Sequence, residues 1–226
     1  MKITELANAN SEQAFTEIFA RSYLALAWGI LVLALFVADS TFRVPAYDSE
    51  AVLTWSVLFV TVAFVGLGQI PKEKAGAVLV GDLTPRHLQR VSAIAGLAAF
   101  AYTCVVGAIA TKGHLYPVLF TDVYRSLAHP WLIALVAVGY PLVFELIFRG
   151  SLQTDFAKSW GVWGIVATIA LNLVVLNPIW PLAILPILFY TYLRSRYHAL
   201  LPSMIAHTAA SIGLYCVVLV THYLKL

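Results

Sequence analysis

Long apolar segments separated by short charged stretches constrain this chain more than any other feature of its sequence. A helix needs about 20 apolar residues to cross the hydrocarbon core of a bilayer, and several segments approach or exceed that length. Of all residues, 61% are hydrophobic and only 11% are charged, whereas soluble domains are roughly 25% charged. We therefore predict an all-α fold: a polytopic transmembrane helical bundle that forms one domain over residues 1–226.

We predict seven spans preceded by an interfacial helix. Residues 1–21 are polar with apolar residues at helical spacing, which is typical of a helix lying on a membrane surface. The sixth span is short for a bilayer, and we expect it to be buried within the bundle. The predicted spans are 22–38, 51–70, 91–111, a fourth from Trp131 with a polar continuation to Gly161, 162–177, 182–193 and 201–224.

The distribution of basic residues predicts the orientation. If successive loops lie on alternating sides of the membrane, ten Lys and Arg residues fall on the side of the N-terminus and four on the other side. Because basic loops stay in the cytoplasm, we expect a cytoplasmic N-terminus, in a bacterial or archaeal cytoplasmic membrane. The net charge of +3 is small, and the basic residues are distributed over short loops. Both features argue against a nucleic-acid partner. Membrane lipids are the partners that the spans imply.

Glu145 and Arg149 lie four residues apart within the apolar fourth span. Four residues is about one helical turn, so the two side chains can pair. Ionisable residues at membrane depth suggest a functional site, but a structural ion pair that holds this helix against its neighbours explains them equally well.

Four further polar residues lie at membrane depth: Asn172, Asn177, His207 and Ser211. Each is either a hydrogen-bonding link between helices or part of a site, because a buried polar side chain must find a partner. His207, among small and apolar neighbours, has few local reasons for its position, so both a structural and a functional role remain open.

These residues give the C-terminal part of the chain a resemblance to the CPBP family of intramembrane glutamic peptidases, which includes CAAX-processing proteases. The family's first motif, Glu-Glu-x-x-x-Arg, corresponds to residues 144–149, read as Phe-Glu-Leu-Ile-Phe-Arg. The second, Phe-x-x-x-His, corresponds to residues 173–177, and the third, His-x-x-x-Asn or Asp, to residues 207–211. Residues 131–226 form the half of the chain that carries these motifs.

The resemblance also implies what this chain lacks. In the family, the first Glu acts as a general base on water, and two His and the Asn complete the site. This chain has Phe144 in place of that Glu, Asn177 in place of the second-motif His, and Ser211 in place of the Asn. His207 alone matches a catalytic position. We expect Glu145 and Arg149 to form a structural ion pair.

Three alternatives would restore chemistry to this site. Glu145 is turned about 100° from Phe144 along an α-helix, so reaching the catalytic water would require the helix to rotate or unwind. A serine mechanism using Ser203 or Ser211 with His207 has unfavourable helical geometry and no evident orienting acid. His207 has no neighbour suited as a second metal ligand, so we predict no metal and no cofactor.

We therefore expect a non-catalytic CPBP-like protein that binds another integral membrane protein or a membrane-associated peptide. The alternative is an active CAAX-type or leader-peptide-processing endopeptidase in which Glu145 and His207 are catalytic. A small transporter is disfavoured, because the two halves do not repeat a pair of interrupted helices.

Overall fold

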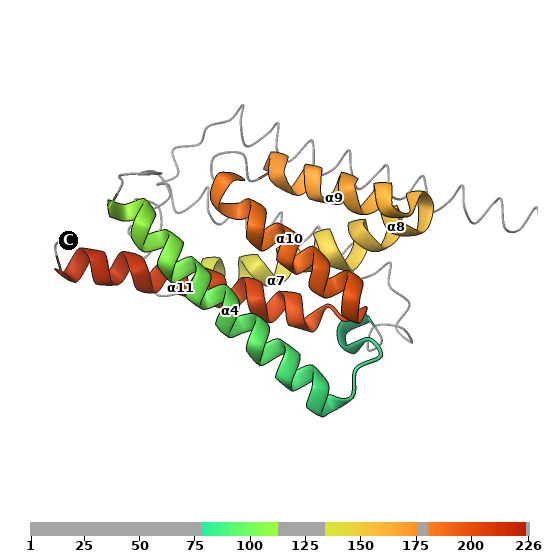
Figure 1. The fold of residues 1–226 in the computed structure, drawn as a ribbon, viewed down its shortest axis with the longest axis horizontal. Helices are drawn as coiled ribbons and strands as arrows, with labels where there is room; N and C mark the ends of the chain where they lie inside the picture. Colours follow the sequence, from blue (N-terminus) through green and yellow to red (C-terminus); the bar gives the residue numbers. More distant parts are fainter. Residues whose placement is uncertain (1–77, 113–133, 176–179, 225–226) are drawn as a thin grey trace, which may run out of the picture.

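The structure is a computed structural model that describes residues 78–112, 134–175 and 180–224. The regular structure within these ranges is helical (Figure 1). The first two predicted spans and the interfacial helix lie outside the described residues. The elements are α4 (Pro85–Lys112), the π-helix η1 (Leu135–Gly139), α7 (Tyr140–Glu145), the π-helix η2 (Leu146–Leu152), α8 (Gln153–Trp160), α9 (Val162–Val175), α10 (Trp180–Tyr197) and α11 (Leu201–Leu224).

Helix α4 begins earlier than the predicted third span. The sequence 86–90 was expected to belong to a charged loop, but it forms the first two turns of α4. Pro85 suits the first helical position, because its missing N–H would have no partner there. The Leu88 amide donates to the Thr84 carbonyl at 2.8 Å, which starts the helix ahead of the proline. The basic residues therefore sit on a helix rather than a loop.

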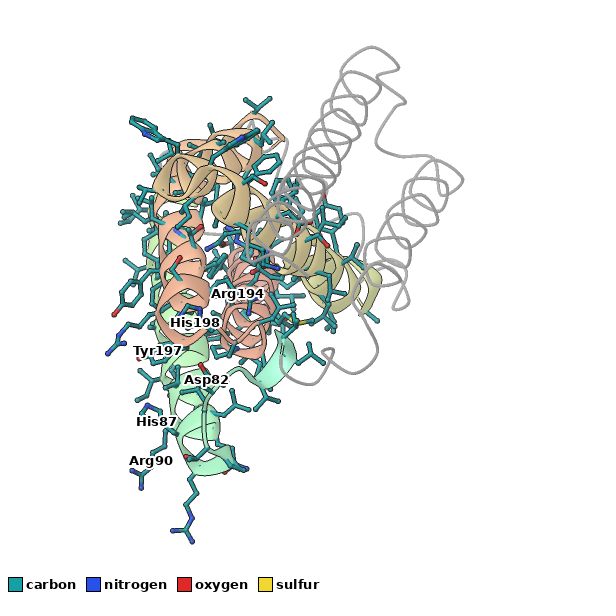
Figure 2. All side chains as sticks on the ribbon, turned by 90° about the vertical axis from the view of Figure 1, so that its right-hand side faces the viewer. Asp82, His87, Arg90, Arg194, Tyr197 and His198 are labelled. Carbon is teal, nitrogen blue, oxygen red and sulfur yellow. The ribbon has the colours of Figure 1, made fainter. Side chains whose placement is uncertain are left out.

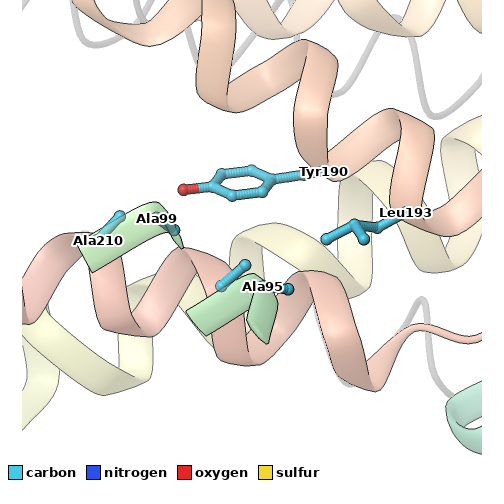
Figure 3. Close-up of a cluster of buried hydrophobic side chains, with 6 residues drawn as sticks. Ala95, Ala99, Tyr190, Leu193 and Ala210 are labelled. Carbon is cyan, nitrogen blue, oxygen red and sulfur yellow. The ribbon is translucent and has the colours of Figure 1, made fainter. Parts of the chain in front are cut away.

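Helices α4 and α11 run side by side in the same direction and pack through small residues (Figure 1). Gly96 faces Ile205, and Gly107 faces Val217 further along both helices. Small side chains let two helix backbones approach closely. The buried cluster at this seam joins α4, α10 and α11 (Figure 3); its members are Ala95, Ala99, Tyr190, Leu193, Ala206 and Ala210.

The predicted fourth span is a composite helix. It passes from η1 through α7 and η2 into α8. Gly161, with a φ of 58°, then reverses the chain into α9, and it tolerates this conformation because it has no Cβ. At Gly164 the backbone of α9 approaches α8 so closely that a Cβ would overlap the Phe156 carbonyl group. The two helices thus form a tight hairpin.

The predicted sixth span differs from α10 in length and in burial. The helix extends to Tyr197, one turn beyond the predicted end, and Pro186 lies inside it. Leu185 is 58% exposed and Tyr192 is 56% exposed, whereas Ile187, Tyr190 and Leu193 are buried. The expectation that this helix is buried within the bundle holds for part of its surface only, since α10 packs on α9 and α11 but also carries exposed apolar side chains.

Two helices in the described part of the chain are long and apolar enough to cross a membrane. They are Pro85–Ala110 and Leu201–Thr221, and Val162–Val174 is a shorter apolar helix. Large apolar side chains are exposed along one face of α4, including Ile94, Leu97, Val105 and Ile109. A stripe of this kind is suited to contact with lipid chains. Two such helices do not test the predicted total of seven.

Candidate functional site

A chain of polar side chains crosses the interior of the bundle. Glu145 ends α7 and is fully buried, and Arg149 lies in η2 and is 1% exposed. Their side chains form an ion pair with 3.2 Å between Glu145 Oε1 and Arg149 Nη1. Because removing two charges from water is costly, such a pair persists only with further hydrogen bonds around it.

Asn172 of α9 supplies part of that support. Its amide is oriented by the hydrogen-bond network, so that Oδ1 accepts from Arg149 Nη1 at 2.6 Å and from Nη2 at 3.0 Å. Arg149 Nη2 also donates to the Ile187 carbonyl of α10, at 3.4 Å. Of the two roles left open for Asn172, the geometry places it as a link between helices that holds the guanidinium group.

His207 of α11 forms the other end of the chain. Its Nδ1 lies 2.9 Å from Glu145 Oε1, within hydrogen-bonding distance. The imidazole stacks on the Tyr190 ring, with centroids 5.0 Å apart and planes at 21°. The Phe144 ring meets it edge-on at 5.7 Å. Side chains from α7, α10 and α11 therefore fix the imidazole on several sides.

Phe144 and Glu145 approach the same imidazole in different ways. Glu145 was expected to reach the family's catalytic water only if the helix rotated or unwound. The helix does widen here, because α7 gives way to η2 directly after Glu145. A π-helical turn bonds residue i to i+5, and such turns are frequent at functional sites. Phe144 is 1% exposed and also stacks on Phe148, with centroids 4.4 Å apart.

Of the remaining predicted residues, Ser203 is buried beside the Glu145 carboxylate. The Ser203 hydroxyl donates to the Leu200 carbonyl at 2.8 Å, a bond within its own helical turn. Ser211 is half-buried on α11, and no hydrogen bond between it and His207 occurs in the described part of the chain. Asn177 lies outside the described residues. The described ranges contain no group of three His, Cys, Asp or Glu side chains able to hold a metal ion.

Several residues that border the site carry no motif in the sequence. Tyr190 is 3% exposed, and the Arg149 guanidinium carbon lies 5.7 Å from its ring centroid. One helical turn from Arg149, Gln153 donates to the Thr191 carbonyl at 3.3 Å and to Ser195 Oγ at 2.9 Å. The spacing of Glu145, Arg149 and Gln153 could have indicated one polar face, since each follows the previous one by four residues.

Within the Glu145–Arg149 pair, two buried atoms make no hydrogen bond that meets the usual geometric criteria. These are Glu145 Oε2 and Arg149 Nε. Buried polar atoms are usually paired, so each unpaired atom leaves capacity for another group. The carboxylate thus uses Oε1 to hold both Arg149 and His207, and the Ser203 hydroxyl also borders it.

A protein-family profile described as Type II CAAX prenyl endopeptidase Rce1-like matches residues 126–213. No curated protein and no solved structure matches the chain. The matched range includes the positions of all three motifs and the whole polar chain from Glu145 to His207. It agrees with the CPBP resemblance drawn from the motif residues. Residues 126–213 are therefore similar to the Rce1-like CAAX endopeptidases, a similarity that is consistent with the CPBP family and supports a membrane protein.

Proposed function

We propose that this chain has lost peptidase chemistry and uses its Rce1-like bundle to bind another integral membrane protein or a membrane-associated peptide. The observation that carries the proposal is the environment of His207. An apolar ring, Phe144, lies against the imidazole at the family's general-base position, while Glu145 Oε1 already contacts both Arg149 and His207. The residues that remain hold helices together, and those that would activate water are replaced.

The size of the expected loss supports this reading. A positioned general base contributes about 10²–10⁴-fold to rate, and each oxyanion donor contributes about 10²–10³-fold. Phe144 removes the first contribution, and Ser211 replaces an amide with a shorter hydroxyl side chain. Little hydrolysis would remain, but the surface and interior of the bundle would still be available for binding.

The Glu145–His207 contact favours one alternative, an active intramembrane endopeptidase. In this alternative, Glu145 orients the imidazole through Nδ1, and the second ring nitrogen takes a proton from water. The water oxygen attacks the scissile carbonyl, and the imidazolium then returns the proton to the leaving amine. His207 is 19% exposed at its side chain, so a reactant has some access to the ring.

A cleavage and binding assay separates the two. Full-length protein in nanodiscs is incubated with a labelled prenylated peptide, and bound and cleaved peptide are measured separately. We expect binding without cleavage, and copurification of a stoichiometric partner from mild detergent. Cleavage that disappears in both Glu145→Ala and His207→Ala would establish the alternative. A monomer that binds neither peptide nor partner would contradict the proposed binding role.

A restored variant provides the positive control. Phe144→Glu combined with Asn177→His and Ser211→Asn restores the three catalytic residues that are replaced in this chain. If the bundle is otherwise intact, this variant should cleave the peptide measurably faster than the wild type. Each substitution alone should have less effect, because groups that act as a unit are not additive.

The proposal retains a cytoplasmic N-terminus. Arg149 is one of the ten basic residues on the N-terminal side, but its side chain is buried against Glu145. Without Arg149, nine basic residues fall on the N-terminal side and four on the other. The excess still follows the positive-inside pattern. A bacterial or archaeal cytoplasmic membrane remains our prediction for its location.

A further inference from the structure

We propose that the paired ends of α4 and α10 form a binding site for the headgroup of an anionic phospholipid. The site comprises Arg86 and Arg90 of α4 and Arg196 and Tyr197 of α10, with His87 between them. This headgroup site is separate from the Glu145–His207 region. Its ligand is a lipid of the surrounding membrane, not a substrate of the Rce1-like domain.

Backbone contacts bring the two helix ends together. The Leu200 amide, just before α11, donates to the Val78 and Leu79 carbonyls at 3.0 and 3.1 Å. At Gly81, with a φ of 62°, a Cβ would lie 2.6 Å from the Tyr197 carbonyl oxygen. The segment that leads into α4 is therefore closely packed against the turn that ends α10.

Arg194 stabilises this junction from the inside. Its Nη1 donates to the Val78 carbonyl at 3.1 Å and also to the His198 carbonyl. Its Nη2 donates to Thr154 Oγ1 at 3.2 Å. Arg194 is 9% exposed and engaged by these contacts, so it acts as a support for the headgroup site and not as a ligand-binding group.

The outer residues, by contrast, present their charges to the surface. Arg86, His87, Arg90 and Arg196 are all exposed. The rings of His87 and Tyr197 lie 6.2 Å apart, linking α4 to α10, and the Arg196 guanidinium carbon lies 6.0 Å from the Tyr197 ring centroid. Figure 2 shows His87, Arg90, Tyr197 and His198 on the same side of the bundle. Asp82, an acidic residue, is labelled on that side as well.

The position along α4 explains why a lipid headgroup fits. Ile94, 68% exposed, and Leu97, 71% exposed, begin the apolar stripe about one turn beyond Arg90. Lipid chains that cover this stripe would place their phosphates at the level of Arg86 and Arg90. Basic residues beside a membrane attract anionic lipids, and Tyr is enriched at the same depth. Charge and depth together identify an anionic phospholipid.

The test uses full-length protein, delipidated in mild detergent and equilibrated with equal amounts of phosphatidylglycerol and phosphatidylcholine. Retained lipids are counted by mass spectrometry. Each juxtamembrane cation contributes about five-fold to attraction, so Arg86→Gln/Arg90→Gln/Arg196→Gln should lower the preference for phosphatidylglycerol by roughly 10²-fold or abolish it. High ionic strength should also weaken the wild-type preference, because exposed charges are screened.

Lys158 supplies a matched control. It is an exposed cation on α8, a helix that reaches the same end of the bundle as the α10–α11 turn (Figure 1). Lys158→Gln should leave the preference unchanged, while Arg196→Gln, which removes the same charge, should lower it about five-fold. Glycerol phosphate, which lacks acyl chains, should not displace the bound lipid. No wild-type preference, equal losses in the two single variants, or displacement by glycerol phosphate would each overturn the proposal.

Discussion

The polar chain and the small-residue seam hold the same bundle together by different means. The polar chain, Asn172–Arg149–Glu145–His207, links α9, η2, α7 and α11 through directional bonds between few atoms. The seam between α4 and α11 uses glycines and alanines that let two backbones approach. Directional bonds fix which residues must meet, whereas close packing fixes only how near the helices lie.

This difference leads to different responses to substitution. In the seam, each contact contributes a small dispersion energy, so the loss from one change is spread over many atoms. In the polar chain, removing one member leaves its partner buried and unpaired, and the cost falls on one group. We therefore expect single substitutions in the polar chain to cost more than those in the seam.

The largest effect is expected for Arg149→Leu. This substitution leaves Glu145 as a buried carboxylate without its cationic partner Arg149, and breaking a buried ion pair costs about 3–5 kcal/mol. Equilibrium unfolding of the purified protein, by titration of dodecyl sulfate into mild detergent, measures the change in the free energy of unfolding.

The double variant Glu145→Leu/Arg149→Leu is the control for that measurement. Replacing both members of a buried pair by apolar groups is often neutral or stabilising. The double variant should therefore recover most of the stability that Arg149→Leu loses. If it is as unstable as the single variant, the cost arises from lost packing, and the distinction between the polar chain and the seam is wrong.

A smaller effect is expected for Asn172→Leu. The leucine removes the oxygen that accepts from Arg149 Nη1 and Nη2. Hydrogen bonds to charged groups contribute about 1.5–3 kcal/mol. Thr168→Val on the same helix is the matched control, because Thr168 is equally buried but donates only to the Gly164 carbonyl of its own helix. Equal losses from the two substitutions would contradict a role for Asn172 in holding Arg149.

Much of the described fold could be predicted from hydrophobicity and helix-ending residues. The predicted seventh span, 201–224, matches α11 at both ends, and Gly161 separates α8 from α9 as its sequence context indicated. The π-helical turns could not be predicted, because no residue in 146–152 specifies i+5 over i+4 bonding. The exposed face of α10 also escaped prediction, since both of its faces are apolar in sequence.

For the site, the sequence identified the residues but not all of their partners. Glu145, Arg149, Asn172 and His207 each stood out as polar residues at membrane depth. Their order along the polar chain depends on how α7, η2, α9 and α11 pack, and spacing within one segment carries no information about this. Tyr190 was missed because an aromatic residue in an apolar helix is ordinarily part of the core.

The smallest effect is expected in the seam, where Gly213→Ala and Gly107→Ala form a matched pair. A Cβ at Gly213 would lie 3.1 Å from the Phe100 carbonyl oxygen and 3.3 Å from its ring, whereas at Gly107 the nearest atom is a Val217 methyl at 3.4 Å. Overpacking costs about 1–3 kcal/mol, and alanine regains about 1 kcal/mol over glycine in a helix. The same unfolding titration should therefore show Gly213→Ala destabilised by about 1 kcal/mol and Gly107→Ala unchanged or slightly stabilised. If Gly213→Ala instead costs as much as Arg149→Leu, close packing is as demanding as directional bonding in this bundle, and the proposed contrast between the two regions fails.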